Sequence, residues 1–485
     1  MQKSLQILVY PPRSADTEYM EHFAQKGILR RSFKAMNTPT LNHRAALVLL
    51  CVGVLAAGAT VGLAGAPVPD TSEGPTGPLS RREAVQWGLE RNPELAALRQ
   101  QHGIAAAAVV IANTYPHNPT WEARVRNADG PISATITNRV PTEQNLIFPV
   151  EIRGQRTFRR QDAAAGLSRT DWEIADQELD LAVRVIRAFD TVLYHEAKLR
   201  VLEETLRVNE QSAGRVKQMV EARLLAGADL ILSRAEVDDT RALASAERAA
   251  VVTARSDLRR ALGTVVPEVD IEGALDAQVP TWDAPDLIQV ALTRRPDMLA
   301  RRAAVREAEA KVRLAVAERI DNPTIGPSYD YDPTRINSIG VFFTVPLPIF
   351  NTKRGEIMQR EAEHQQAVLR VRQADAAIRQ EVQAAIARLE TTRASVETYS
   401  RQVLPHLEGL LREILNLFEK GVGGVDALKV IEIRRRLLTA REGRLAALWD
   451  LSQARADLAA AVGDPALALV PEEELPPPAP EAPPR

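Results

Sequence analysis

The feature of this chain that most constrains its fold is an internal duplication. The line ARSDLRRALG, which ends at Gly263, returns as ARADLAAAVG, which ends at Gly463. Three further pairs of motifs recur in the same order: GLERNPELA with ALTRRPDML, HNPTW with DNPTI, and AGADLIL with GGVDALK. Four matched landmarks in one order predict two copies of one unit, Leu79–Gly263 and Asp286–Gly463, joined by a connecting segment, 264–285.

Each copy is predicted to hold the same succession of elements: a helix, two strands, a very long helix, a glycine-containing turn and a returning helix. Pro93 and Pro296 fall in the early turns of the opening helices and predict a kink or a break there, as Pro405 does in the second long helix. Apolar alternation between Gly, Pro, Asn and Asp residues predicts the strands. The expected ranges are helix 81–113, strands within 119–150 and long helix 157–224, then helix 284–319, strands within 323–350 and long helix 354–418.

The first long helix shows a coiled-coil pattern. The stretch 157–224 contains no proline, and its apolar positions are spaced alternately by three and four residues. This spacing is typical of a seam along which a second helix packs. At 1.5 Å per residue, a helix of roughly 65 residues is on the order of 100 Å long. The seam residues are Val192, His195, Leu199, Leu202, Leu206, Asn209, Ala213, Val216 and Val220.

The composition and the hairpins together predict an assembly of several copies. Aromatic residues make up 4% of the chain and charged residues 26%, a mixture that suits long helices. Neither a two-stranded hairpin nor one amphipathic helical hairpin buries its apolar face alone. A closed ring of copies would satisfy both requirements, because it pairs every strand and leaves no sheet edge.

The two ends of the chain predict export and disorder. Basic residues precede a short Leu/Val-rich run, 47–55, which fades into Ala and Gly and ends at 64–66. This pattern predicts a signal peptide over 1–66, with Met36 as an alternative start. An uncleaved membrane anchor and lipidation of Cys51, the one cysteine, remain alternatives. A Pro/Gly-rich linker, 67–78, follows the predicted signal peptide. An acidic, Pro-rich tail, 464–485, is expected to be disordered.

The duplicated motifs resemble those of the TolC-like family of outer-membrane efflux proteins. The resemblance covers Leu79–Gly463. It rests on the RNPEL and RRPDM pair, the two NPT strand starts, FPVEIRGQR from Phe148, PLPIFNTKRGE from Pro346, and the glycine turns before DLILSRAE and DALKVIEIRRRL. GQR at Gly154–Arg156 and NTKRG at Asn351–Gly355 are most similar to the CzcC-like branch, which serves cation efflux.

The resemblance implies a mainly α fold with a small β part. It implies a homotrimer in the outer membrane of a Gram-negative bacterium, with a large periplasmic part. In such a trimer each chain gives four strands to one shared transmembrane β-barrel and its long helices to a coiled-coil barrel. The chain would be a passive channel that receives substrate from a periplasmic adaptor and an inner-membrane pump, expected to be of the proton-driven RND type. Cation efflux, drug efflux and type I protein secretion remain alternatives, and a periplasmic adaptor or structural coiled coil is the alternative of another class.

The two glycine turns are the predicted docking sites for the adaptor. The resemblance places the corresponding turns at the periplasmic entrance of the channel. We expect Leu230 and Ile231 to supply apolar contacts, whereas Gly227 and Gly424 permit the tight turns; an ordinary coiled-coil turn would also favour glycine. The residues of these two turns are Gly227, Ala228, Asp229, Leu230, Ile231, Ser233, Gly424, Val425, Asp426 and Leu428.

Three further groups of residues have expected roles at the pore or the membrane. Asp229, Asp426 and Glu432, repeated around a threefold axis, could form a cation-selective constriction, although single carboxylates on helices are usually solvated. Aromatic residues near the strands suit the girdles of a membrane barrel: Trp121, Phe148, Tyr329, Tyr331, Phe342 and Phe343. A solvated helix start is the alternative for the basic residues after the strands, although cations disfavour helix N-termini. These residues otherwise suit lipid phosphates or a partner: Arg153, Arg156, Arg159, Arg160, Lys353 and Arg354.

Several function classes lack support in the sequence. The chain has no Walker motif, no paired-glycine dinucleotide loop and no metal-hydrolase signature, so we expect no enzyme activity and no cofactor. A net charge of -2 and the lack of a basic block argue against nucleic acid. None of the seven histidines has the i, i+4 spacing of a helical metal site, and no metal site is predicted.

Overall fold

The computed structural model describes residues 74–75, 77–127, 140–223, 225–275, 282–419 and 427–469. The chain divides into two compact units, Met1–Ala66 and Pro67–Arg485, and all of the described residues belong to the second. The predicted signal peptide and most of the predicted linker therefore lie outside the described residues.

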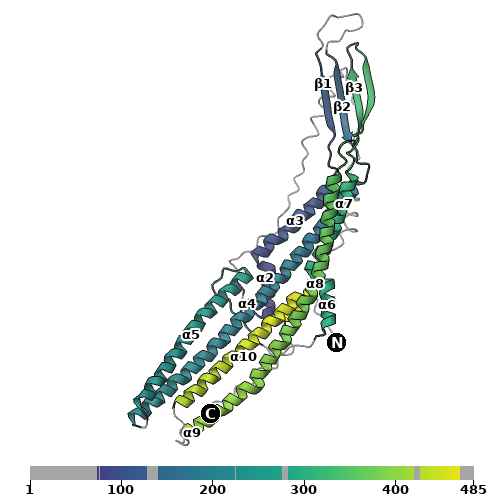
Figure 1. Ribbon diagram of the computed structural model, residues 1–485. Helices are drawn as coiled ribbons and strands as arrows, with labels where there is room; N and C mark the ends of the chain where they lie inside the picture. The colour runs from purple at the N-terminus through teal and green to yellow at the C-terminus, as the bar shows by residue number, and fades with distance from the viewer. Residues whose placement is uncertain are drawn as a thin grey trace, which may run out of the picture. The chain divides into compact units, whose positions relative to one another are not determined.

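The two copies contain the same elements in the same order (Figure 1). The first copy consists of α2 (Arg81–Arg91), α3 (Pro93–Asn113), β1 (Thr120–Val125), β2 (Thr142–Pro149), α4 (Gln155–Glu221) and α5 (Gly227–Leu262). The second consists of α6 (Ala284–Arg294), α7 (Pro296–Ala317), β3 (Thr324–Tyr331), β4 (Asn337–Thr344), α8 (Arg354–Thr398), α9 (Leu404–Glu419) and α10 (Ala427–Val462).

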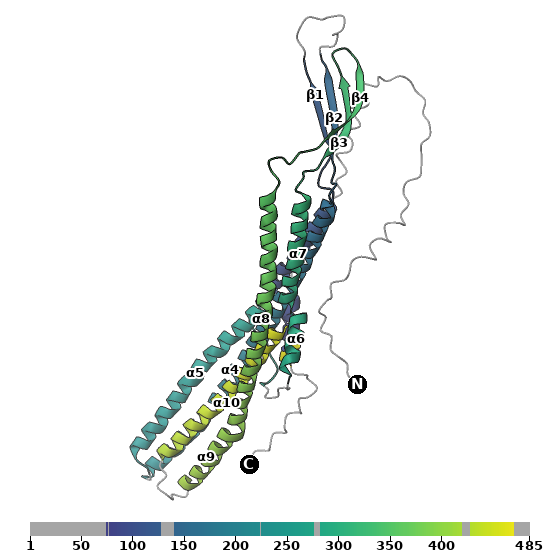
Figure 2. The ribbon, with the colours of Figure 1, turned by 45° about the vertical axis from the view of Figure 1, so that its right-hand side comes forward.

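The four strands form one antiparallel sheet in the order β1-β2-β3-β4 (Figure 2). The register pairs Trp121 with Leu146, Gln144 with Tyr329, and Tyr329 with Ile339. Because side chains alternate between the faces of a strand, this register fixes which residues share a face. Within the described residues, β1 and β4 each pair on one side only, so the sheet has two open edges.

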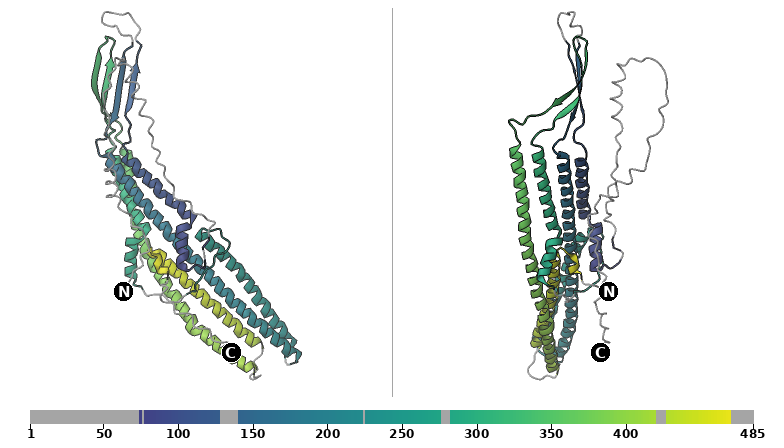
Figure 3. Two further views of the ribbon diagram at one scale, coloured as in Figure 1. Left: turned by 180° about the vertical axis from the view of Figure 1, so that it is seen from behind. Right: turned by 90° about the vertical axis from the view of Figure 1, so that its right-hand side faces the viewer.

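Long helices lie side by side next to the sheet. Four of them follow the order α3-α4-α7-α8 through successive contacts, and the right-hand view of Figure 3 shows this row. The strand order is the same as this helix order, because β1 follows α3, β2 precedes α4, β3 follows α7 and β4 precedes α8. The molecule therefore has one lateral side formed by α3 and β1 and another formed by α8 and β4.

The predicted seam on the long helix is where α4 packs on α5. Val192, Leu202, Asn209 and Val216 are buried along α4, which contains 67 residues. The one polar member of this buried set is satisfied, because the Asn209 Nδ2 atom donates to the Thr240 Oγ1 atom at 3.0 Å. The alternation of three and four residues thus corresponds to a real helix–helix contact.

In each copy, the glycine at the end of the returning helix packs against the break between the two opening helices. Gly263 and Gly463 adopt left-handed backbone conformations, with φ of 74° and 83°, which glycine adopts without steric cost. A Cβ atom on Gly263 would lie 2.5 Å from the Pro93 Cδ atom, and one on Gly463 would lie 3.1 Å from the Arg295 Cα atom. Each returning helix therefore ends against the break between two helices, α2 and α3 or α6 and α7.

The same joint uses different side chains in the two copies. In the first copy the Asn92 Oδ1 atom accepts from the backbone of Glu94 and Leu95, so Asn92 caps α3. Its Nδ2 atom donates to the carbonyl of Ala261 at 2.9 Å. In the second copy Arg295 has the equivalent place, and its Nη1 atom donates to the carbonyl of Ala461 at 3.2 Å. The duplication is thus preserved at the level of contacts although the residue types differ.

Two predictions in the C-terminal part of the chain needed refinement. The kink predicted at Pro405 takes the form of a π-helical turn, Tyr399–Val403, between α8 and α9, consistent with a proline that cannot donate to the preceding turn.

The start of the predicted disordered tail is ordered instead. Asp464 accepts from Ala466 and begins a 3-10 turn, Pro465–Ala468, which buries Ala468 in the core; residues 470–485 lie outside the described residues.

Candidate functional site

The two faces of the sheet differ sharply in polarity. On the face that carries Trp121, most of the residues are apolar: Trp121, Ala123, Val125, Leu146, Phe148, Ile325, Pro327, Tyr329, Tyr331, Ile339, Val341 and Phe343. The opposite face is mostly polar and holds a charge network in which Arg124 pairs with Glu122 at 2.9 Å and with Glu143 at 3.2 Å. An exposed apolar face opposite a hydrated polar face is the pattern of strands in a membrane barrel.

Five of the six predicted girdle aromatics share the apolar face, and Phe342 does not. Phe342 follows the alternation onto the polar face, where its Cε1 atom lies 3.1 Å from the position of a Cβ atom on Gly326. Phe342 is therefore separated from the other five predicted girdle residues by the sheet itself. The FF dipeptide gave no means of telling which ring faces which side, because the two registers of a strand differ by one residue.

Residues from the motifs meet where the strands join the helices. The Gln155 side chain, from GQR, is buried and donates to the Asn322 Oδ1 atom at 2.8 Å. The Asn322 side chain, from DNPT, lies 3.2 Å from the Nε2 atom of His117, from HNPT. Tyr115 donates from its hydroxyl to the Pro149 carbonyl at 2.5 Å. These motifs therefore hold the junction together, a structural role that the spacing in the sequence alone did not reveal.

The first predicted docking turn presents less free surface than expected. It joins α4 to α5, and Ile231, with 72% of its surface exposed, is its prominent apolar residue. Leu230 is half-buried, and Ser233 is buried, so Ser233 is not available for docking. Ser233 lies two residues beyond Ile231, inside α5, which packs mainly on α4.

The glycine in this turn does not have the predicted conformational role. Gly227 is the first residue of α5, and the positive φ of the turn, 60°, belongs to Arg223. A Cβ atom on Gly227 would meet nothing within 4 Å. Gly424, Val425 and Asp426 of the second turn lie outside the described residues, and Leu428, at the start of α10, is exposed.

The carboxylates predicted to form a constriction have partners within the chain. Asp229 accepts at its Oδ2 atom from the backbone N–H of Ala226 at 3.1 Å and so caps α5. Glu432 pairs with Arg436 one helical turn away at 2.6 Å. Asp229 and Glu432 therefore each have a partner within the chain, and Asp426 lies outside the described residues.

The two helical hairpins are linked by side chains near their middle. Tyr194 of α4 stacks on Trp449 of α10, with ring centroids 5.4 Å apart. Nearby, the seam residue His195 lies 2.6 Å from the Glu247 carboxylate, which also pairs with Lys198 at 3.1 Å. Nearer the turns, Arg435 of α10 reaches Glu236 of α5 at 2.5 Å. His195 thus hydrogen-bonds to the Lys198–Glu247 ion pair between packed helices, as a packed seam residue should.

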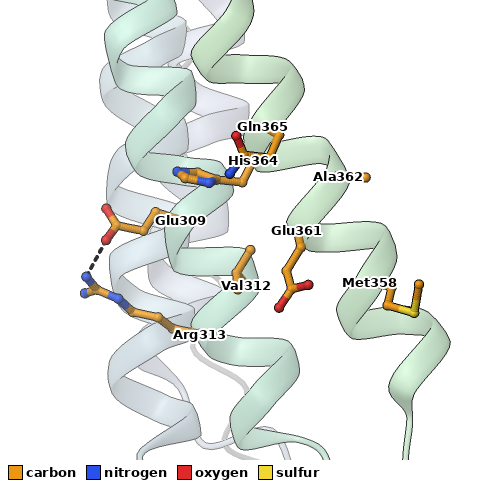
Figure 4. Close-up of a pocket in the computed structure, with 8 residues that line it drawn as sticks. All are labelled: Glu309, Val312, Arg313, Met358, Glu361, Ala362, His364 and Gln365. Carbon is orange, nitrogen blue, oxygen red and sulfur yellow. Dashed lines mark hydrogen bonds and ion pairs between the residues drawn. The ribbon is translucent and has the colours of Figure 1, made fainter.

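A pocket between α7 and α8 has a mixed lining (Figure 4). On its α7 side Glu309 and Arg313 pair with each other at 2.5 Å, and on its α8 side the Glu361 carboxylate points into the space between the helices. His364 and Met358 also line it. Within the part of the chain that the structure describes, no group of three or more His, Cys, Asp or Glu side chains is placed to hold a metal ion.

A half-buried carboxylate lies between the two copies. Asp176 of α4 lines a groove with Asp297 and Arg301 of α7. Burial, reinforced by the carboxylates of Asp297 and Asp180, raises the pKa of Asp176 to about 6. Arg295 and Arg301 oppose this rise through their positive charges. The contact between α4 and α7 therefore changes its charge within a mildly acidic pH range.

The exposed side of α3 is unusually apolar. Pro93–Asn113 is long and apolar enough to cross a membrane by composition alone, and it is the one such helix among the residues that the structure describes. Ile104, Val110 and Ile111 are exposed on it. Since α3 packs along α4 and is followed by the edge strand β1, this apolar surface lies on a lateral side of the molecule.

Comparison with known proteins gives matches that cover most of the chain. Residues 287–464 match the model of the family described as outer membrane efflux protein. The chain is 24% identical over 391 residues to the cobalt-zinc-cadmium resistance protein CzcC of Cupriavidus metallidurans, which covers 78% of this chain and 88% of CzcC. It is also 24% identical over 394 residues to the probable outer membrane lipoprotein SilC of Salmonella typhimurium, covering 75% of this chain and 81% of SilC.

The fold is shared with solved channel structures. CusC superposes on this chain with a TM-score of 0.67 at 18% identity, and the match covers 79% of this chain and 92% of CusC. The predicted fold class, mainly α with a small β part, is thereby confirmed.

Proposed function

Because this chain belongs to the outer membrane efflux protein family, we propose that it forms the outer-membrane channel of a tripartite efflux system. The observation that carries this proposal is the four-stranded sheet with two open edges, one apolar exposed face and one polar face. A sheet of this kind satisfies its backbone in a membrane only when the edges are paired and the barrel closes. A periplasmic adaptor or a structural coiled coil would have no use for such a face.

In our proposal, three chains close the ring. Head-to-tail contact joins β1 of one chain to β4 of the next, and α3 of one chain packs beside α8 of the next. Contacts of this heterologous type form closed rings when the rotation between copies permits it. The exposed apolar residues on both lateral sides, Ile111 on α3 and Leu369 on α8, support this packing. The chain then acts as a passive conduit, without a catalytic site or cofactor.

The proposed partners are a periplasmic adaptor and an inner-membrane pump. The adaptor would contact the turn before α5 and the start of α10, where Ile231 and Leu428 are exposed by 72% and 53%. Exposed apolar residues at a turn are unfavourable in water unless another protein covers them. The pump would supply the energy, because the chain has no nucleotide-binding motif.

Heavy-metal cations are the proposed substrate class. The support is the similarity to a cobalt-zinc-cadmium resistance protein, together with the NTKRG and GQR motifs of the sequence. Drug efflux and type I protein secretion are the competing outcomes.

A deletion strain tests both the function and the substrate. It should become sensitive to one or more of cobalt, zinc, cadmium and copper, and the wild-type gene should restore resistance. Sensitivity to drugs alone would replace the metal assignment, and unchanged resistance to every compound would contradict efflux.

Matched variants test the docking turn in the same strain. Ile231→Asn, combined with Leu428→Asn, should lower resistance while the protein still reaches the outer membrane. Val252→Asn is the control, because Val252 is also exposed on α5 but lies away from the turn. Equal resistance in both variants would contradict docking at the turns.

A further inference from the structure

The segments that join strands to helices expose apolar side chains at equivalent places in the two copies. We define the connectors as residues 150–154, between β2 and α4, and residues 345–353, between β4 and α8. Figure 2 shows the chain passing through these connectors from the sheet to the long helices. Their sequences, VEIRG and VPLPIFNTK, occupy the same position in the duplicated units.

Exposed apolar residues follow the apolar sheet face along the chain into both connectors. On β4 the alternate residues Ile339, Val341 and Phe343 are exposed, and the same alternation runs on through Val345, Leu347 and Ile349. Leu347 is 73% exposed and Ile349 71% exposed. After β2 the alternation of Phe148 continues through Val150 and Ile152, which is 64% exposed.

Phe350 is the most exposed apolar side chain of the two connectors. It is 98% exposed, the highest exposure among the large apolar residues described. A contiguous apolar surface of this kind on a protein marks a site for a protein or a membrane.

The backbone of the connectors is held in place by hydrogen bonds and ion pairs. The Tyr115 hydroxyl donates to the Pro149 carbonyl and accepts from the backbone N–H of Glu151 at 3.3 Å. Glu151 pairs with Arg159 at 2.5 Å. In the second connector, Lys353 pairs with Asp321 at 2.9 Å. The first connector is thus held at Pro149 and Glu151, and the second is held at its last residue.

The first connector and the first turns of the helices that follow the connectors carry arginines that are not used inside the chain. Arg153, Arg160 and Arg354 are exposed, and within the described ranges their side chains make no hydrogen bond or ion pair. By contrast, Arg159 and Lys353 are paired, and Arg156 donates to the Asn113 carbonyl at 3.1 Å. A guanidinium group binds phosphate oxygens through two parallel hydrogen bonds.

We propose that the two connectors bind anionic phospholipid of the membrane leaflet on the periplasmic side. Leu347, Ile349 and Phe350 enter the boundary between headgroups and acyl chains, and Arg153 and Arg354 bind the lipid phosphates. Interfacial segments that combine apolar and basic side chains bind membranes in this way. This inference rests on the proposed function, because it needs the sheet to lie in the outer membrane.

A second chain is the competing occupant. In the proposed ring, chains meet at the sheet edges β1 and β4, and the first connector follows β2, an inner strand, so Ile152 and Arg153 lie away from that contact. The second connector follows the edge strand β4, so a second chain competes with lipid there. An occupant common to both connectors must reach inner and edge strands alike, as a lipid leaflet does.

Site-specific fluorescence tests the proposal. The full chain is purified with a single added cysteine, Phe350→Cys, labelled with bimane and reconstituted into phosphatidylethanolamine vesicles that contain phosphatidylglycerol or phosphatidylcholine with a nitroxide on the upper acyl chain. The parent chain, with Cys51 alone, measures background labelling. Ile339→Cys on the apolar sheet face and Ile231→Cys at the far turn are the matched positions.

The proposal expects quenching at position 350, stronger with labelled phosphatidylglycerol than with phosphatidylcholine, and no quenching at position 231. Replacing Arg153 and Arg354 by alanine should reduce the preference for phosphatidylglycerol by roughly fivefold for each arginine. Arg156→Ala should keep the preference, because that side chain is already engaged.

Two results would overturn the proposal. Quenching at position 339 without quenching at position 350 refutes lipid binding by the connectors and leaves the channel function in place; a bismaleimide cross-link between copies at position 350 would then assign the surface to a second copy. An absence of quenching at both positions refutes the membrane position of the sheet, and with it the proposed function.

Discussion

Replacement of Gly263 by alanine tests the duplicated joint at which each returning helix meets a helix break. Gly263 and Gly463 both have a left-handed φ, so an alanine at either position costs about 1–2 kcal/mol in backbone strain. The two sites differ in space. A Cβ atom at 263 would lie 2.9 Å from the Asn92 Cα atom and closer still to Pro93, whereas the nearest atom at 463 is 3.1 Å away.

The larger clash makes the first site the more sensitive one. Overpacking of this kind adds roughly 1–3 kcal/mol, and a displaced Asn92 also loses its cap on α3, worth about 1 kcal/mol. We therefore expect Gly263→Ala to destabilise the protein by roughly 2–5 kcal/mol and Gly463→Ala by roughly 1–3 kcal/mol. Both changes act on the joint and leave the sheet and the turns untouched.

The assay is the loss of helical circular dichroism on heating of the detergent-purified protein. Unfolding of a membrane assembly is not two-state, so the comparison uses midpoints rather than free energies. Gly103→Ala and Gly214→Ala are the controls, because both lie within helices with open space around them and should be neutral or slightly stabilising. An unchanged midpoint for Gly263→Ala would refute the joint.

Three further predictions follow from local features. Because the pKa of Asp176 is raised in the folded protein, the folded state binds this proton more tightly than the unfolded state does. The stability of the protein should therefore fall as pH rises from about 4 through about 6. Asp176→Asn should remove this loss, which is on the order of 1–2 kcal/mol after allowance for solvent screening, and the thermal midpoint measured against pH checks it. Lys353 immediately precedes α8 with a left-handed φ of 52°, as Gly154 precedes α4 with 75°. Lys353→Gly should therefore stabilise by about 1 kcal/mol and Gly154→Lys should destabilise, in the same thermal assay. Ile339→Arg, on the apolar sheet face, should cost about 2–4 kcal/mol near the membrane midplane and reduce the assembled protein in outer-membrane fractions, whereas Ser338→Arg, on the polar face, should not.

For each of these predictions, one experimental result would contradict it. Identical pH profiles for wild type and Asp176→Asn would remove Asp176 as the titrating group. A lower midpoint for Lys353→Gly would show that the ion pair with Asp321 outweighs the backbone strain. Equal amounts of assembled Ile339→Arg and Ser338→Arg protein would contradict a lipid-facing side of the sheet.

The sequence predicted the order of the elements well because their signals are local. Proline placed the breaks between α2 and α3 and between α6 and α7, and the three-four spacing placed the contact of α4 with α5. The duplication then gave the second copy from the first. Such signals depend on residues close in the chain, which is why they survive without tertiary information.

The site was harder to predict because it depends on tertiary packing. Ser233 belongs to a motif at the docking turn, yet it is buried among the packed helices. Phe342 and Phe343 are adjacent in sequence and opposite in the sheet. Gly227 was assigned the turn conformation that Arg223 adopts. In each case the deciding fact is a register, a neighbour or a backbone angle, and composition contains none of them.

Electron cryomicroscopy of the full chain, purified from outer-membrane fractions, tests the central proposal most directly. The proposal predicts three copies around one axis, with β1 of one copy hydrogen-bonded to β4 of the next and the face of Trp121 turned outward to lipid. A particle with unpaired β1 and β4 edges, another number of copies, or the face of Trp121 turned inward would contradict it.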